Sequence, residues 1–164
     1  MRQTLFVTLL TAFALAVPAA AGLPRAGLLV PGRSLGGIRL GEPTRAVRAA
    51  LGHRYGVCND CARPTWYFTY KPFDAHGLAV EFGRRRVVAV YTLWKPAGWR
   101  ATNGLRLGAS PLAVHRRAGR LRTISCDGYD ALAADRARSR TAYFLFDGSL
   151  WGFGLFLPNW SPCR

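Results

Sequence analysis

The chain has 164 residues, half of them hydrophobic, and its 23 lysines and arginines against 8 aspartates and glutamates give a formal net charge of +15. This length supports one ordinary hydrophobic core or two small units that share one. The charge favours either association with polyanions or a solvated arginine-rich surface, but no nucleic-acid-binding motif is present, so we expect no nucleic-acid partner.

The first 21 residues have the pattern of a secretory signal peptide. Arg2 gives a positive start, residues 5–17 are apolar, and residues 19–21 are the small alanines of a cleavage site. No later stretch reaches the roughly 20 apolar residues of a membrane span. The residue directly after the cleavage site is not a cysteine, so no lipid anchor is expected there. We expect cleavage after Ala21 and a protein that is secreted or associated with the cell envelope.

One segment of sixteen residues occurs twice. Residues 37–52 and residues 104–119 share seven identical positions, including the glycine at each end. Similarity at a fixed spacing indicates a chain built from two copies of one unit. In each copy, a proline near the first turn and a final glycine predict a short helix of about eight residues.

Apolar runs separated by turns predict three strands after each helix. We expect strands over residues 66–70, 77–82, 86–93, 129–133, 141–146 and 149–157. Asp147 and Gly148 are a strong hairpin turn signal, and Arg84 and Arg85 take the same place in the first copy. The predicted fold class is α+β: a tandem duplication of a short helix followed by a three-stranded antiparallel meander, with the helices on one face of the sheet.

These elements divide the chain into six parts. In order, they are a signal peptide (1–21), an extended lead-in (22–34), repeat unit 1 (35–93), a connector (94–103), repeat unit 2 (104–157) and a tail tied by a disulfide (158–164).

Four cysteines in an exported chain predict two disulfides, for which three connectivities exist. A local bridge Cys58–Cys61 and a staple Cys126–Cys163 need the least rearrangement, so we predict those two. A redox-active pair is disfavoured because Cys58 follows a helix instead of beginning one. The second cysteine pair, Cys126 and Cys163, is 37 residues apart and no histidine has the spacing of a zinc ligand, so we expect no metal site.

Strand alternation assigns side chains to two faces of the sheet. The face that we expect the helices to cover carries Val80, Phe82, Val87, Ala89 and Tyr91, then Phe144, Phe146, Trp151, Phe153 and Leu155. The opposite face carries Glu81, Val88, Val90 and Thr92, then Tyr143, Leu145, Gly152, Gly154 and Phe156. The second face is less apolar without being polar, so it either contacts a second layer or binds a partner.

The tandem arrangement resembles the β-lactamase-inhibitory-protein-like fold, and single units resemble the small lipoproteins of the outer-membrane β-barrel assembly machinery. The resemblance covers residues 36–157, and it is carried by Ile38, Arg39, Leu40, Gly41, Val47 and Gly52, then by Leu105, Arg106, Leu107, Gly108, Val114 and Gly119. Inhibitory members bind an enzyme through aromatic residues on the sheet face, which implies a binding role. The assembly-machinery role is disfavoured without a lipid-anchoring cysteine, and no inhibitory motif matches residue by residue.

No catalytic constellation is recognisable. The three histidines lie near helix ends or in a loop, no serine sits in a Gly-x-Ser-x-Gly elbow, and no phosphate-binding loop is present. We therefore expect a non-enzymatic protein without a cofactor.

Two functions of different class follow. The first is an exported module that binds a protein partner through its sheet face, with Tyr143, Leu145, Phe156, Val88 and Val90 as the contact residues. The alternative is a basic envelope-associated protein that holds anionic wall polymer or lipid headgroups with Arg84, Arg85, Arg86, Arg116 and Arg117. Binding to a polyanion would weaken steeply with ionic strength.

Overall fold

The computed structural model describes residues 27–58, 60–69, 77–94 and 96–164. The predicted signal peptide and the loop that contains His76 lie outside these residues. Within them, no helix combines the length and the apolar composition needed to cross a bilayer.

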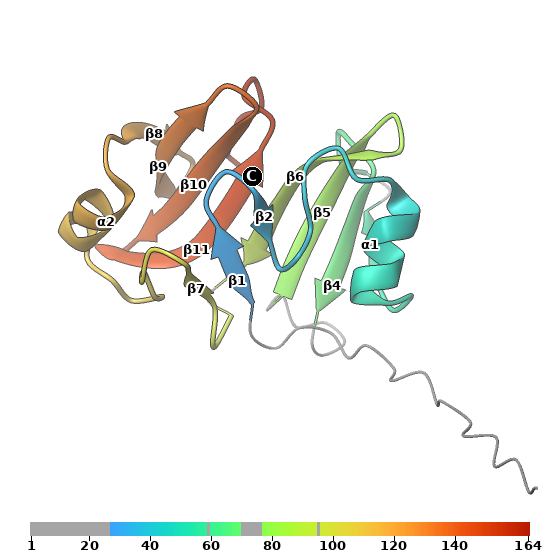
Figure 1. The fold of residues 1–164 in the computed structure, drawn as a ribbon, viewed down its shortest axis with the longest axis horizontal. Coiled ribbons are helices and arrows are strands. Elements are labelled where there is room, and N and C mark those ends of the chain that lie inside the picture. The colour runs from blue at the N-terminus through green and yellow to red at the C-terminus, as the bar shows by residue number, and fades with distance from the viewer. Residues whose placement is uncertain (1–26, 59, 70–76, 95) are drawn as a thin grey trace, which may run out of the picture.

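An antiparallel sheet of eight strands runs through the whole molecule (Figure 1). Its strand order is β3-β4-β5-β6-β11-β10-β9-β8. The strands are β3 (Gly56–Cys58), β4 (Thr65–Thr69), β5 (Gly77–Gly83), β6 (Arg86–Leu93), β8 (Arg122–Cys126), β9 (Tyr129–Arg136), β10 (Ser139–Phe146) and β11 (Ser149–Phe156). The last strands of the two halves, β6 and β11, pair with Val90 opposite Leu155, so both halves share one continuous sheet.

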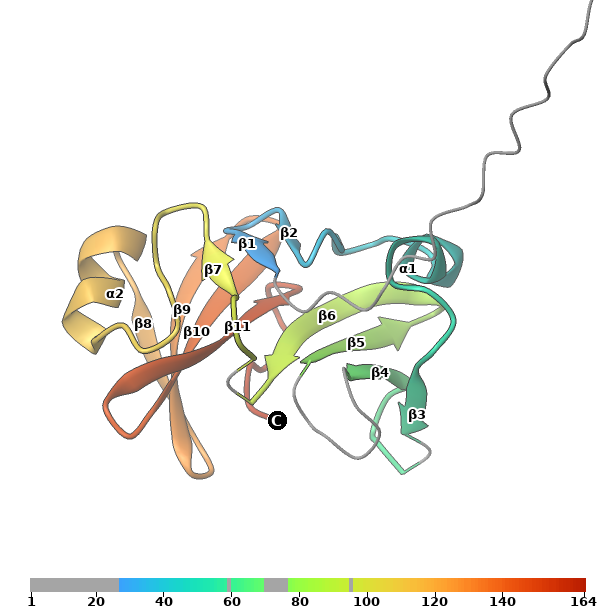
Figure 2. The same cartoon turned by 90° about the horizontal axis from the view of Figure 1, so that it is seen from below.

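Two helices and a small sheet pack on this large sheet (Figure 2). The helices are α1 (Thr44–Leu51) and α2 (Pro111–Ala118), and the small sheet has the order β2-β1-β7, formed by β1 (Leu28–Val30), β2 (Ser34–Leu35) and β7 (Arg100–Ala101). Figure 1 shows the helices at opposite ends, with the small sheet between them. Apolar residues of all five elements join one core cluster with residues of the large sheet.

The predicted fold class is wrong. The described residues form eleven strands and only two helices of eight residues each, so the fold is mainly β. Each half contributes four strands to the large sheet, because each half has an additional edge strand, β3 or β8, where we predicted no strand. An edge strand pairs on one side only and needs no continuous apolar pattern. The apolar pattern of the sequence therefore did not predict β3 and β8.

The repeated segment has the same place in both halves. Gly41 N donates to Val87 O of β6, and Gly108 N donates to Leu150 O of β11. Both glycines adopt a positive φ, near 81° and 87°, which a residue with a side chain rarely adopts. The Leu-Gly pair therefore turns the chain off the sheet and directs it into the helix.

The lead-in and the connector contain strands. β1 lies in the predicted lead-in and pairs in parallel with β7, which lies in the predicted connector. Trp99 precedes β7 and is almost fully buried. A Cβ atom at Gly27 would lie 2.5 Å from the Trp99 ring, so only glycine allows this close approach.

Two β-bulges invert the strand alternation that we assumed. The pairing of β5 with β6 skips Val88, and the pairing of β10 with β11 skips Trp151. An extra residue moves every side chain beyond it to the other face. As a result, Val90 and Tyr143 pack in the cluster that contains the helices, whereas Tyr91 packs on the opposite face.

Candidate ligand-binding groove

The five residues predicted to contact a partner do not form an exposed surface. Tyr143 and Phe156 are 1% and 0% exposed, and Val88, Val90 and Leu145 are buried or half-buried. Tyr143, Val90 and Leu145 pack on the helix side, whereas Phe156 packs on the other face. Their expected exposure is thus corrected. The bulges place Val90, Tyr143 and Leu145 on the helix side, whereas Phe156 lies on the expected face and is buried there against Tyr91, Phe144 and Arg164.

A groove of about 670 Å³ opens on the face opposite the helices, where the two halves of the sheet meet. We call it the aromatic groove, because seven of its fourteen lining residues are aromatic. These residues are Tyr67, Tyr91, Thr92, Leu93, Trp94, Asp127, Gly128, Tyr129, Phe144, Phe146, Asp147, Ser149, Trp151 and Arg164.

The floor and one wall of the groove are packed rings. Tyr129 meets Phe144 and Trp151 edge-on, with ring centroids 5.7 and 5.6 Å apart. Phe156 lies beneath, 6.4 Å from Phe144 and 6.1 Å from Tyr91. Such edge-to-face and offset pairs hold one another in place, so the groove has a preformed inner surface.

Trp94 and Phe146 line the groove with open ring faces. Their exposed fractions are 63% and 57%, and neither has a ring or cation partner among the described residues. Trp94 follows β6 with a φ of 55°, a left-handed conformation that is unfavourable for a bulky residue. Strained backbone of this kind concentrates at functional sites, so Trp94 is a candidate functional residue.

The tail closes one side of the groove. Cys163 is bonded to Cys126, and the second disulfide joins Cys58 to Cys61, so both predicted bridges are confirmed. The Arg164 N–H donates to the Tyr129 hydroxyl at 2.7 Å. Both disulfides fit a protein that folds in an oxidising compartment.

An ion pair lies under the tail. Arg164 Nε is 2.5 Å from Oε1 of Glu81, a carboxylate that is only 5% exposed. The guanidinium also lies over Tyr91 and Phe156, 5.4 and 5.0 Å from the ring centroids. Burial, with the Glu81 charge beside it, raises the pKa of Tyr91 well above its usual range, so this hydroxyl stays neutral.

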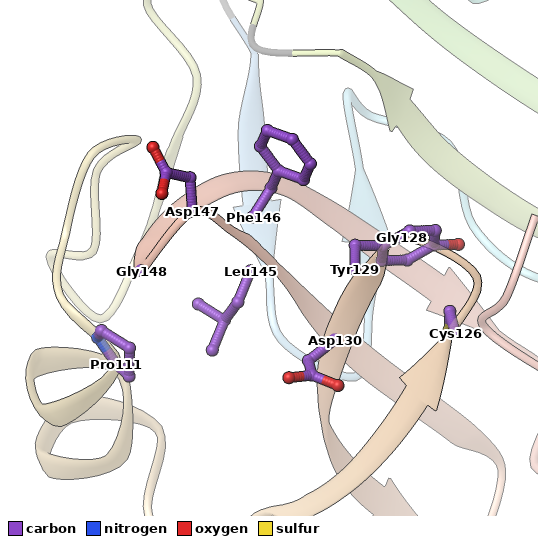
Figure 3. Close-up of a pocket in the computed structure, with 9 residues that line it drawn as sticks. All are labelled: Pro111, Cys126, Gly128, Tyr129, Asp130, Leu145, Phe146, Asp147 and Gly148. Carbon is purple, nitrogen blue, oxygen red and sulfur yellow. The ribbon is translucent and has the colours of Figure 1, made fainter.

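Two carboxylates, Asp127 and Asp147, line the groove at exposed turns. Neither has a hydrogen-bond or ion-pair partner for its side chain in the part of the chain that is described. A second hollow of about 700 Å³ adjoins the groove and shares Phe146 and Asp147 with it (Figure 3). Figure 3 places Phe146 at the end of β10 and Asp147 in the turn that follows, with Asp130 across the hollow near the start of β9.

The described lining of the groove offers aromatic stacking surfaces, two free carboxylates and one arginine, which is paired with Glu81. Across the described ranges, no group of three histidine, cysteine or acidic residues is placed to hold a metal ion. His53 and His115 are exposed and do not line the groove.

The predicted polyanion-binding arginines are exposed but do not form one patch. Arg84 and Arg85 form the turn between β5 and β6, with φ of 50° and 62°, as a two-residue hairpin requires. Arg86 Nη1 donates to Gly41 O at 2.9 Å. Arg116 and Arg117 lie on α2, at the other end of the sheet (Figure 1).

Sequence reasoning missed most of the aromatic groove. We placed Trp94 in the connector, and Tyr91, Phe144, Phe146 and Trp151 under the helices. The density of aromatic residues around the turns after β6 and β10 was the available signal, but only the pairing of β6 with β11 brings these turns to one site.

No protein-family model matches the chain, and no protein of curated function matches it. One similar solved structure is an extracellular protein containing a SCP domain from Bacillus anthracis str. Ames, with a TM-score of 0.52 and 10% identity. The match covers 71% of this chain and only 43% of that protein, and it concerns the fold alone. Another is a DUF4309 family protein (YjgB) from Bacillus subtilis subsp. subtilis str. 168, with a TM-score of 0.48, 13% identity, and coverage of 75% of this chain and 84% of that one.

Proposed function

We propose that the chain is an exported, non-enzymatic binding module that holds a segment of a protein partner in the aromatic groove. The observation that carries this proposal is the pair of exposed rings, Trp94 and Phe146, on a groove already lined by packed aromatics. Exposed apolar patches mark interaction sites, and aromatic anchors carry most of the binding energy at protein interfaces.

Two further observations support the proposal. The disulfides and the extracellular nature of the SCP-domain protein support export. The resemblance to β-lactamase-inhibitory proteins stays a prediction, and it implies the same mode of contact, through aromatic residues on a sheet face.

Trp94→Ala combined with Phe146→Ala is expected to weaken binding of partner segments by tenfold or more, on the order of 1.4 kcal/mol, because the exposed anchors are lost. The measurement is affinity for peptides selected from a random display library on the oxidised protein. Thermal stability should stay within about 0.5 kcal/mol of the parent, since both rings are exposed.

Leu112→Ala is the matched control, because Leu112 is 64% exposed on α2, away from the groove. The control should bind the selected peptides as the parent does. Equal affinities of the parent and the groove variant would refute the proposal.

The second candidate function is binding to an anionic envelope polymer, and it is favoured by the exposed turn of Arg84, Arg85 and Arg86. Replacing these three by glutamine should lower the salt concentration that elutes the protein from a column of anionic polymer, because counterion release sets such binding. The same change at Arg116 and Arg117 is the comparison. If neither variant elutes earlier, the charge of the chain is a property of its solvated surface.

A further inference from the structure

We infer that the aromatic groove selects partner segments that carry a lysine or arginine side chain, a specificity that rests on the binding function proposed above.

Two carboxylates without an arginine partner line the same groove of a basic chain. The chain has 23 basic residues for 8 acidic ones, and Asp135 and Glu81 are both paired with arginine. Asp127 and Asp147 have no arginine partner among the described residues. They come from different turns but line the same groove. They give this site a local negative charge on a basic molecule, and that charge complements a cation.

The exposed rings fit the same ligand. A guanidinium or ammonium group is attracted to the face of an aromatic ring, most strongly to that of tryptophan. The chain already seats its own arginines in this way: Arg63 lies 3.7 Å from the Trp160 centroid, and Arg48 lies 4.9 Å from that of Trp66. Trp94 offers an open face of the same kind beside the groove.

The groove already contains one contact of the proposed kind, made by an arginine of the chain itself. Arg164 lies over Tyr91 and Phe156 while its guanidinium pairs with Glu81. Arg164 is the one cation among the described residues that line the groove, and its guanidinium is already paired with Glu81. Among the described residues of the groove, an anionic ligand would therefore meet two free carboxylates and no free cation, whereas a basic side chain would repeat the Arg164 arrangement at the outer rings.

The test uses the display selection on the oxidised protein, followed by affinities for capped peptides. Each selected peptide is compared with a version in which glutamine replaces its lysine or arginine. We expect enrichment of basic residues and a preference of about fivefold or more for the basic version, falling with added salt. Asp127→Asn with Asp147→Asn should remove this preference, because the affinity for the basic version falls to about that for the glutamine version.

Glu42→Gln, near the start of α1, is the control for loss of a surface carboxylate and should keep the preference. Selected peptides without basic enrichment, or a preference that survives both asparagine changes, would overturn the inference while the proposed function stands. If no selected peptide depends on Trp94 and Phe146, the proposed function fails as well.

A second copy of this arginine-rich chain is the competing occupant. Sedimentation velocity of the protein alone shows whether the chain is a monomer or a dimer. A monomer supports a separate partner, whereas a dimer that dissociates in the Trp94→Ala, Phe146→Ala variant would assign the groove to self-association and overturn the inference.

Discussion

Replacement of Arg164 by alanine is expected to lower the free energy of unfolding by about 3 kcal/mol or more, the usual cost of removing one partner of a buried ion pair. Glu81 would be left as a nearly buried carboxylate without its counter-charge, and Tyr91 and Phe156 would lose the guanidinium that covers them. Urea unfolding under oxidising conditions measures the loss.

An exposed pair provides the matched control. Arg122 pairs with Asp135, and these side chains are 55% and 44% exposed. Arg122→Ala should cost less than about 1 kcal/mol, because water screens the pair. Glu81→Gln added to Arg164→Ala should restore part of the loss, since the orphaned charge disappears. Similar losses from Arg164→Ala and Arg122→Ala would contradict a buried role for the Glu81 pair.

Local signals predicted the parts of the fold that local chemistry determines. The terminal glycines of the repeated segment end both helices, with φ of 85° at Gly52 and 80° at Gly119. The Asp147 turn and the Cys58–Cys61 bridge were likewise visible in short stretches of sequence, and each depends on a few neighbouring residues. The Cys126–Cys163 bridge joins residues 37 apart, and the even number of cysteines predicted it.

Long-range pairing determines the remainder. The small sheet joins β1 to β7 across some seventy residues, and neither strand is long enough to leave a periodic pattern. The bulges at Val88 and Trp151 are set by the turns and by pairing across strands. A one-residue insertion has no signature in apolar alternation. The face assignment therefore failed beyond the bulge in the first hairpin, at Ala89 and Tyr91, and on the turn side of the bulge in the second, at Phe144 and Trp151.

The groove also depends on glycines whose role we misread. We placed Gly152 and Gly154 on the face that could bind a partner, where a residue without a side chain would leave space open. Instead, the molecule fills that space itself: a Cβ atom at Gly154 would collide with the Phe156 ring, and one at Gly152 would lie 2.6 Å from Thr92 Oγ1. The glycines thus allow the floor of the groove to pack closely, and the exposed rings lie further out, at Trp94 and Phe146.

The second large effect is a loss of stability that we expect from buried aromatic residues and not from the exposed rings of the groove. Phe156→Ala and Tyr143→Ala are each expected to cost about 3 kcal/mol or more, because both side chains are buried and their removal leaves cavities on opposite faces of the sheet. Trp94→Ala should leave stability nearly unchanged, since most of its ring already contacts solvent. Denaturant unfolding and peptide affinity, measured on the same variants, separate the two roles. A stable Phe156→Ala protein that loses peptide binding would mean that Phe156 belongs to the contact surface, and the floor of the groove would then have to open when the partner binds.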